Sequence, residues 1–311
     1  YNIVVADTDL DGDREIVVGI KDYRTARSMV ILDPETRAIE WSDSSLGTEL
    51  KCFDVSEKDA AGNRKLALCK YKENYIDEVE LLFFDTVTHQ LMRAGSLPCD
   101  GWINSMFYLE SHPEFQGEEI AFADSHLAVY KGQTLEEIWS TDLFIEHAEP
   151  VDLDQDGNLE IVSIASVEQF GDPNVVVFDA VTGVTEFESA PFSTAAFWME
   201  LADIDEDGVV EIGVFSVDYM CILNGASDTY DLQMELDEAR CFDFGDILPE
   251  TPGIEIIMCL GNNFAADVYI YSGMTFTEVS SFSIPDAWTI TGVEVADVNA
   301  DGTPEILRKN E

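Results

Sequence analysis

The sequence predicts an all-β fold: a seven-bladed β-propeller of four-stranded antiparallel blades, whose last blade has only its first two strands, A and B, within this chain. Three observations support this prediction. A nine-residue acidic phrase followed by a strand occurs four times. Degenerate copies of the phrase and a second kind of hairpin lie between those copies. The copies follow one another at intervals of 40 to 56 residues, a period typical of propellers and solenoids.

The acidic phrase has the composition of a calcium-binding loop. Its four copies are DTDLDGDRE, DLDQDGNLE, DIDEDGVVE and DVNADGTPE. Side-chain oxygens at positions 1, 3, 5 and 9, with the backbone carbonyl of position 7, can surround a hard cation, and the glycine at position 6 permits a sharp turn. An EF-hand loop would instead carry its glutamate at position 12 and continue into a helix. One copy alone could be an Asp-rich surface turn, but four copies at equivalent places favour a metal site.

The phrases predict four structural Ca²⁺ sites, because clustered carboxylates repel one another without a cation. The predicted ligands at positions 1, 3, 5, 7 and 9 are Asp7, Asp9, Asp11, Asp13 and Glu15; Asp152, Asp154, Asp156, Asn158 and Glu160; Asp203, Asp205, Asp207, Val209 and Glu211; and Asp297, Asn299, Asp301, Thr303 and Glu305.

Three degenerate copies keep the flanking strands but lose the series of carboxylates. They begin at Asp54, Glu110 and Asp243. In the first of them, Lys65 stands where the glutamate of position 9 is expected, so its ammonium group would take the place of the cation. We expect no calcium in these three copies.

Between successive phrases lies a second hairpin, such as SMVILDPETRAIEWS or NVVVFDAVTGVTEFES, which reads as strand, polar turn and strand. Two hairpins in each repeat give four strands. An unclosed ring would leave strand edges unpaired, so we expect upstream residues, a partner or a further segment to complete the last blade. We expect a single propeller domain over residues 1–311, with blades at about 1–49, 50–100, 101–146, 147–194, 195–238, 239–286 and 287–311.

The strand, D-x-D-x-D-G-x-x-E loop and strand resemble the FG-GAP (VCBS) repeat of integrin α-like calcium-binding β-propellers, over nearly the whole chain. The hairpin FDAVTGVTEF is similar to a phrase of quinoprotein-like propellers, but the quinone-binding residues of that family are missing. The resemblance implies that the calcium loops lie on one face and that partners dock on the opposite face. Trp102, Trp198 and Trp288 fall on that opposite face as a candidate ligand surface; the alternative is that they fill the core.

The chain is strongly acidic. It has 63 Asp and Glu against 16 Lys and Arg among 311 residues, which gives a formal net charge of −47. Such a surface repels nucleic acid and anionic membranes, and it suits saline surroundings, as in a halophilic or marine source, or a partner with a basic face. No apolar run approaches the roughly 20 residues that a membrane-spanning helix needs, so we expect no direct membrane insertion.

The six cysteines add an independent argument. Cys52 and Cys69 flank one degenerate loop, and Cys241 and Cys259 flank another. Neighbouring antiparallel strands can bring such residues within disulfide range, so we expect the disulfides Cys52–Cys69 and Cys241–Cys259 to replace calcium as staples. The alternative is two pairs of buried thiols. Cys99 and Cys221 show no such symmetry. Disulfides and calcium loading together imply an extracellular or cell-surface location.

No catalytic motif stands out. The four histidines are scattered, and the sequence has no G-x-S-x-G, phosphate-binding glycine loop or C-x-x-C. We therefore expect a non-catalytic binding or structural module for adhesion, surface assembly or matrix recognition. Its partner would be a protein or glycan on the face opposite the calcium loops, or further copies of itself. The alternative is a carbohydrate-binding or polysaccharide lyase-like propeller, since some propellers of the resembled type are lyases.

Overall fold

The computed structural model describes residues 3–19, 29–44, 50–59, 61–72, 77–99, 102–109, 118–167, 171–192, 196, 198–216, 219–227, 229–236, 239–248, 250–262, 265–285, 290–298 and 302–310. Within these residues the chain forms strands β1 to β26, joined by turns and loops.

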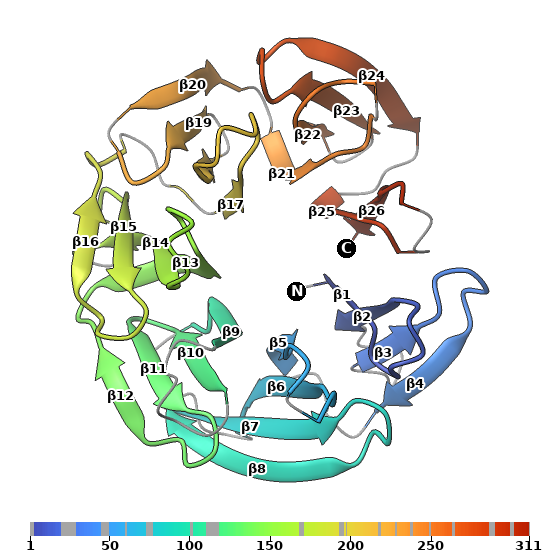
Figure 1. The fold of residues 1–311 in the computed structure, drawn as a ribbon, viewed down its shortest axis with the longest axis vertical. Coiled ribbons are helices and arrows are strands. Elements are labelled where there is room, and N and C mark those ends of the chain that lie inside the picture. The colour runs from blue at the N-terminus through green and yellow to red at the C-terminus, as the bar shows by residue number, and fades with distance from the viewer. Residues whose placement is uncertain are drawn as a thin grey trace. The chain divides into compact units, whose positions relative to one another are not determined.

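The strands form antiparallel sheets in chain order. Six sheets have four strands each, and a seventh contains only β25 and β26 (Figure 1). The prediction of an all-β propeller with four-stranded antiparallel blades is confirmed for six blades, and the seventh sheet has two strands. We number the blades from one to seven and call the four strands of each blade A to D.

The chain divides into two compact units, which are described separately. The first unit comprises residues 1–145 together with 181–183 and 298–300. Its strands are β1 (Ile3–Ala6), β2 (Glu15–Gly19), β3 (Met29–Leu32) and β4 (Ile39–Asp43) in blade 1; β5 (Leu50–Val55), β6 (Lys65–Tyr71), β7 (Glu78–Asp85) and β8 (Leu91–Pro98) in blade 2; and β9 (Ser105–Leu109), β10 (Glu119–Ala123), β11 (Leu127–Lys131) and β12 (Glu137–Ser140) in blade 3.

The second unit comprises residues 146–180, 184–297 and 301–311. Its strands are β13 (Phe144–Val151, which begins just before the boundary), β14 (Glu160–Ser166), β15 (Asn174–Asp179) and β16 (Thr185–Glu188) in blade 4; β17 (Trp198–Ala202), β18 (Glu211–Phe215), β19 (Tyr219–Asn224) and β20 (Tyr230–Glu235) in blade 5; β21 (Ala239–Gly245), β22 (Glu255–Asn262), β23 (Ala265–Ser272) and β24 (Glu278–Pro285) in blade 6; and β25 (Ile290–Ala296) and β26 (Glu305–Asn310) in blade 7.

Burial follows the place of a strand in its blade. Every residue of the B strands β10, β14 and β18 is buried, whereas the D strand β20 alternates between half-buried and exposed residues. A strand covered on both faces must be apolar throughout, which explains runs such as EIVSIAS. Within each unit the core lies between the facing sheets of neighbouring blades, as where Leu81 and Phe83 of blade 2 cluster with Ile120 and Phe122 of blade 3.

The strand register corrects the predicted start of the degenerate copy in blade 6. In blades 1, 5 and 7, the residue before position 1 pairs with the glutamate of position 9. In blade 6 Gly245 makes this pairing with Glu255, so Asp246 occupies position 1. The prediction that Asp243 does so is wrong, because strand A continues past Asp243 before the loop begins.

The degenerate copy in blade 2 is displaced in the same way. The Ser56 N–H donates to the carbonyl of Lys65 at 2.8 Å, which puts Glu57 at position 1, three residues after the predicted Asp54. The phrase of blade 2 is therefore EKDAAGNRK, and its Gly62 has the left-handed φ of 84° found at position 6 of the intact phrases. The predicted start at Glu110 lies outside the described residues.

Asp54 and Asp243 instead join strands A of neighbouring blades. Asp54 Oδ2 accepts the N–H of Tyr108 at 2.9 Å, and Asp243 Oδ2 accepts the N–H of Val295 at 2.5 Å. In both cases the donor lies two residues before the loop of the next blade. The two aspartates are thus structural links between blades within their own unit.

Candidate metal centre

The loops of blades 1, 4 and 5 share a backbone conformation that turns side chains inward. At position 4, Leu10, Gln155 and Glu206 have positive φ angles of 69°, 58° and 61°. The glycine at position 6 has φ of 106°, 93° and 91° in these three loops, values that few other residues adopt. Alternating right- and left-handed residues make the loop concave, so short carboxylates along it converge.

Hydrogen bonds inside each loop hold this conformation. In the loop of blade 5, the N–H of Asp207 donates to Asp205 Oδ1 at 3.1 Å, and the N–H of Val209 donates to Asp207 Oδ1 at 2.8 Å. The N–H of Gly208 donates to Asp203 Oδ2 at 3.0 Å. Blade 4 repeats all three bonds, and blade 1 repeats the first two. Each aspartate is therefore oriented by the loop backbone.

The glutamate of position 9 ties strand B to the start of the loop. Glu15, Glu160 and Glu211 each accept the N–H of position 2 on Oε2, at 2.5, 2.8 and 2.8 Å. Their side chains are buried, with Glu211 only 1% exposed. The Oε1 atom of Glu211 is also buried and has no hydrogen-bond partner. A buried carboxylate oxygen without a partner is costly unless a cation compensates it.

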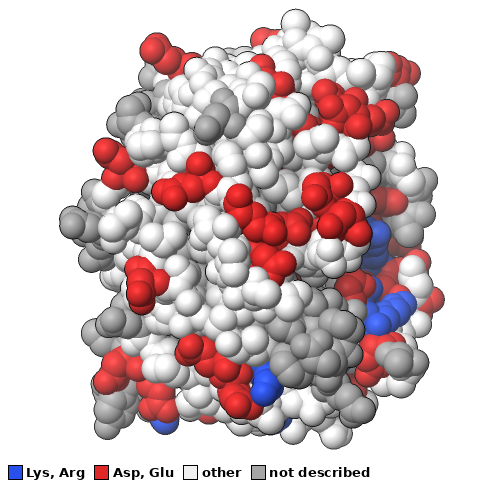
Figure 2. Space-filling view, turned by 60° about the vertical axis from the view of Figure 1, so that its left-hand side comes forward, with Lys and Arg blue, Asp and Glu red and all other residues white. Residues whose placement is uncertain are grey.

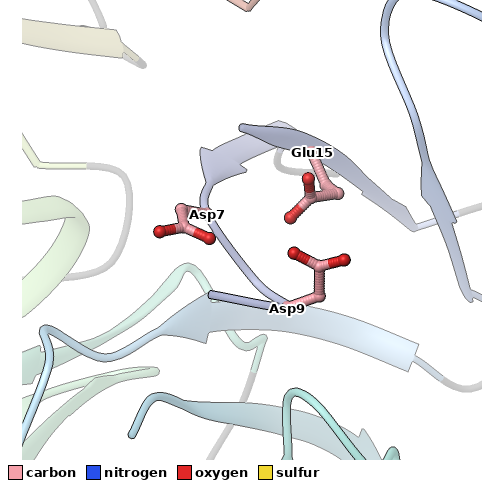
Figure 3. A group of neighbouring side chains, drawn as sticks. All are labelled: Asp7, Asp9 and Glu15. Atoms are coloured by element: carbon pink, nitrogen blue, oxygen red, sulfur yellow. The ribbon is translucent and has the colours of Figure 1, made fainter. Parts of the chain in front are cut away.

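Three carboxylates converge in each of these loops. One oxygen from each of positions 1, 3 and 9 lies within 4.8 Å of the others, and the groups are Asp7, Asp9 and Glu15; Asp152, Asp154 and Glu160; and Asp203, Asp205 and Glu211. Figure 3 shows the first group, with one Asp7 oxygen directed toward Asp9 and Glu15 and the other directed away. Such a set of oxygen ligands can hold a hard cation.

The pKa values reflect this crowding. Burial, followed by the repulsion of the neighbouring aspartates, raises the pKa of Glu160 to about 6 and that of Glu211 to about 7. The pKa of Glu15 is raised for the same reasons. A cation that binds here would favour the ionised carboxylates and so remove the electrostatic cost of the cluster.

Other predicted ligands are not in these groups. The aspartates of position 5, Asp11, Asp156 and Asp207, are exposed and lie outside the three convergent sets. The side chains of position 7 also lie outside these sets; position 7 was predicted to contribute only its carbonyl oxygen. In blade 7 the Gly302 N–H donates to Asp297 Oδ2 at 2.9 Å, as in blades 4 and 5, whereas Asn299 and Asp301 lie outside the described residues.

Blade 1 differs from blades 4 and 5 by a lysine. Lys58, at position 2 of the loop of blade 2, reaches across to Asp7, and its Nζ donates to Asp7 Oδ2 at 2.8 Å. Burial acts to raise the pKa of Asp7, but this hydrogen bond and those from the N–H groups of Gly12 and Leu10 lower it below its usual value. Asp7 Oδ1 is buried and has no hydrogen-bond partner, so one oxygen of Asp7 could still bind a cation.

The degenerate loops use the first residue of strand B differently. The prediction that the ammonium group of Lys65 takes the place of the cation in the loop of blade 2 is wrong. Lys65 instead forms an ion pair with Glu118 of blade 3 at 2.5 Å. Glu255 of blade 6 is fully buried and accepts the N–H groups of Ile247 and Leu248, each at 3.0 Å. In blade 6 the glutamate that begins strand B therefore keeps its structural role, although its loop is one residue longer and has lost the other carboxylates.

A second set of carboxylates in the second unit was missed by the sequence analysis. Three residues before position 1, strands A of blades 4 to 7 carry Glu149, Glu200, Asp243 and Glu294. Burial, then Asp243 and Glu149, raise the pKa of Glu294 to about 8. Burial, partly offset by the N–H groups of Val295 and Phe244, raises the pKa of Asp243 to about 7. The signal was present as E-x-x-D before the phrases of blades 4, 5 and 7.

These carboxylates have defined partners. His147 Nε2 and Glu149 Oε1 are 2.7 Å apart, and Trp198 Nε1 donates to Glu200 Oε1 at 2.6 Å. The rings of His147 and Trp198 stack with their centroids 5.6 Å apart. We call Glu149, Glu200, Asp243 and Glu294 the strand-A carboxylates.

The three tryptophans proposed as a ligand surface have different surroundings. Trp102, just before strand A of blade 3, is 72% exposed. Trp198 is half-buried and packs against the core cluster around Phe242. Trp288 lies outside the described residues.

The paired cysteines lie directly opposite each other across strands A and B. The register pairs Cys52 with Cys69 and Cys241 with Cys259. A β-bulge precedes the first cysteine in both blades, so the two arrangements are equivalent. All six cysteines are buried, and no disulfide joins any two of them in this structure.

The surface is dominated by acidic side chains. Figure 2 shows Asp and Glu spread across the view, with Lys and Arg near its lower and right edges. The sequence has no Lys or Arg between Lys131 and Arg240, a stretch that includes all of blades 4 and 5. Within the described part of the chain, no helix has the length and apolarity that crossing a membrane requires.

Comparisons with known proteins agree with this architecture. Residues 254–307 match the FG-GAP-like repeat family, whereas a search of curated proteins found no match to the sequence. Among solved structures, the chain is similar to crystal structures of BBS1N in complex with ARL6DN, one soaked with mercury and one with lead.

The likeness to the first has a TM-score of 0.72 at 10% identity and covers 99% of this chain and 88% of that chain. For the second, the TM-score is 0.68 at 10% identity, with 99% and 87% covered. At this identity the likeness shows the fold alone. The chain is a β-propeller that carries an FG-GAP-like repeat, as the resemblance of its loops implied.

Proposed function

We propose that this chain is a calcium-stabilised β-propeller that acts outside the cell as a non-catalytic module for binding a protein partner. The observation that carries the proposal is the convergence of three carboxylates in each of three equivalent loops. An enzyme or lectin role has no comparable support among the described residues.

Calcium is the cation that these loops fit. Ca²⁺ takes six to eight oxygen ligands in flexible geometry, whereas Mg²⁺ needs a near-ideal octahedron and keeps several waters. Positions 1, 3 and 9 would supply carboxylates, and position 5 and the carbonyl of position 7 would complete the set. The bound ion would supply the positive charge that lets the clustered carboxylates remain ionised and so keep strands A and B together. Blade 7, with Asp297 and Glu305, would hold a fourth ion.

The protein-binding role rests on the comparisons and on one exposed side chain. The similar BBS1N was crystallised in complex with ARL6DN. The resemblance to FG-GAP propellers implies that partners dock on the face opposite the calcium loops. In blade 3, Trp102 precedes strand A and therefore lies at the edge opposite the A–B loop. An exposed tryptophan is a typical anchor of a protein interface. Nearby, Lys51 Nζ lies 4.6 Å from the ring centroid of Tyr71, whose hydroxyl accepts the N–H of Ile103.

A photo-crosslinking amino acid at position 102 tests this role. Introduced in place of Trp102 and expressed in the source cells, it is expected to trap a discrete protein partner under ultraviolet light. The control is the same amino acid in place of Val184, which is 61% exposed in the C–D turn of blade 4, at the calcium-loop edge. Crosslinks from position 184 but not from position 102, or the same products from both, would contradict the proposed face.

The extracellular location rests on the cysteines as well as on calcium. We expect Cys52–Cys69 and Cys241–Cys259 to form disulfides when the chain is secreted, because the register places each pair side by side. Each bond closes a loop of nearly 20 residues, worth about 3 kcal/mol. Alkylation in denaturant without reductant, read by mass spectrometry, should label only Cys99 and Cys221. Labelling of all six thiols in secreted protein would refute the pairing.

A further inference from the structure

Each complete blade has a β-bulge in its outermost strand. The pairing of strands C and D shifts by one residue in all six blades, which leaves one unpaired residue on strand D. In blades 1 to 6 this bulge residue is Glu40, Met92, Ile138, Glu186, Asp231 and Val279.

Whether the bulge residue is acidic or apolar correlates with whether the A–B loop of the same blade keeps its carboxylates. In blades 1, 4 and 5, whose loops gather three carboxylates, it is acidic: Glu40, Glu186 and Asp231. In blades 2, 3 and 6, whose loops have lost them, it is apolar. Since 63 of the 311 residues are acidic, three acids at three such places would arise by chance in about 1% of cases.

The bulge lies beside the loop in space. The C–D turn that precedes it is fastened to the end of the A–B loop, as where the Ala180 N–H donates to the carbonyl of Leu159 at 3.1 Å. The equivalent bond joins Gly273 to Ile254 in blade 6. The strand-D bulge therefore sits next to the A–B loop whether or not the loop is acidic.

The acidic bulge residues interact with the carboxylates of their own loops. The charges of Asp9 and Glu15 repel that of Glu40, and the charges of Asp154 and Asp156 repel that of Glu186. The charge of Asp231 likewise repels that of Asp205. All three bulge side chains are exposed, so they do not fill the core. Without a cation, each adds repulsion to a loop that already holds three converging carboxylates.

We propose that Glu40, Glu186 and Asp231 are further members of the cation sites in blades 1, 4 and 5, where they act as outer carboxylates that hold water bound to the cation. This rests on the calcium binding proposed above. The buried, unpartnered Oε1 of Glu211 in the loop beside Asp231 points independently to a cation there. Calcium takes up to eight oxygen ligands, so a wet coordination position beside the bulge is expected. The acidic bulge residue thus marks the blades that bind calcium.

The test neutralises two bulge residues in the second unit. E186Q/D231N is compared with E188Q/E235Q, which removes the same two charges from exposed positions of the same strands, β16 and β20. Isothermal titration with CaCl₂ should show two sites weakened three- to tenfold in E186Q/D231N, at unchanged total stoichiometry, and less than twofold change in the control. In chelator, E186Q/D231N should melt at a higher temperature than the wild type, because repulsion is relieved.

In E186Q/D231N the calcium affinity should fall while the melting temperature in chelator rises. This combination distinguishes a cation-site role from a merely structural one. The inference is overturned if E186Q/D231N binds calcium like E188Q/E235Q, or if it melts at a lower temperature than the wild type in both calcium and chelator. If the wild type itself takes up no calcium, the proposed function fails as well, so the two failures are distinguishable.

Discussion

Removing calcium is expected to lower the melting temperature of this protein by about 15–20 °C. Each occupied site stabilises the folded state by about 2.7 kcal/mol at a hundredfold excess of calcium over Kd. The three loops with convergent carboxylates would together contribute about 8 kcal/mol. This approaches the entire stability of an ordinary domain, about 5–15 kcal/mol. For a chain of this size, 1 kcal/mol shifts the melting temperature by roughly 2 °C.

The measurement is calorimetry in excess CaCl₂ and in chelator, at matched ionic strength. The match is essential because a net charge of −47 makes the fold sensitive to any salt through screening. Equal melting temperatures in CaCl₂ and in NaCl of the same ionic strength would show that the loops are only acidic turns. Elemental analysis of the dialysed protein should find three or four bound calcium ions, and the fourth would belong to blade 7.

Two equivalent glutamates provide a matched pair of variants. Glu211 of blade 5 and Glu255 of blade 6 both begin strand B opposite the end of strand A, although the loop of blade 6 is one residue longer. Both are buried, and both accept backbone N–H groups of their loops. Glu211→Gln should remove one bound calcium and about a third of the calcium-dependent stabilisation. Glu255→Gln should lose a similar hydrogen bond but leave the calcium count unchanged. Loss of calcium from both variants would mean that the ion in blade 5 does not depend on its convergent carboxylates.

The blade architecture could be predicted because it depends on short, local sequence patterns. Hydrophobic alternation, turn residues and the glycine of position 6 each depend on a few neighbouring residues. The degenerate copies show where local prediction fails. In blade 2 the run FDV resembles the end of strand A followed by the first aspartate of a loop, but Asp54 lies within strand A, which continues through Val55. Only the pairing with strand B identifies Glu57 as position 1, and pairing is not visible in one strand alone.

The strand-A carboxylates and the bulge acids could not be recognised from one repeat. Glu186 lies in a D strand that reads as an ordinary polar edge, and its meaning depends on Asp154, which is 32 residues earlier. A register shift of one residue decides whether such a side chain pairs or bulges. Similarly, Glu200 and Asp243 come from different blades and interact only because the folded chain packs strands A side by side.

Replacing Glu294 by glutamine is expected to stabilise the protein by about 3 kcal/mol at pH 8 and to leave it unchanged at pH 4.5. The pKa of Glu294 is raised from 4.5 to about 8, through burial and then through Asp243 and Glu149. Between these pH values the unfolded carboxyl group ionises while the folded one keeps its proton. Stability therefore falls as pH rises through this window.

The magnitude follows from linkage. At about 1.4 kcal/mol for each pH unit between the two pKa values, the penalty reaches about 5 kcal/mol. Water that reaches the half-buried side chain reduces it, which gives the expected 3 kcal/mol. Glutamine has the same shape but cannot ionise, so it removes the penalty.

Urea unfolding from pH 4.5 to 8.5 measures this effect. Calcium must be kept in excess, because the raised pKa values of Glu160 and Glu211 would otherwise add their own pH dependence. The control is Glu235→Gln on the exposed strand β20, which removes one charge from the same unit and should shift the curve by less than 0.5 kcal/mol.

An unchanged pH slope in the Glu294→Gln variant would show that this carboxylate is already ionised when folded. A variant that is less stable at every pH would show instead that the charge of Glu294 is needed by a partner. The expected result is a flatter curve that meets the wild type at low pH. In that case protons relieve the repulsion among the strand-A carboxylates, as we propose that calcium does within the A–B loops.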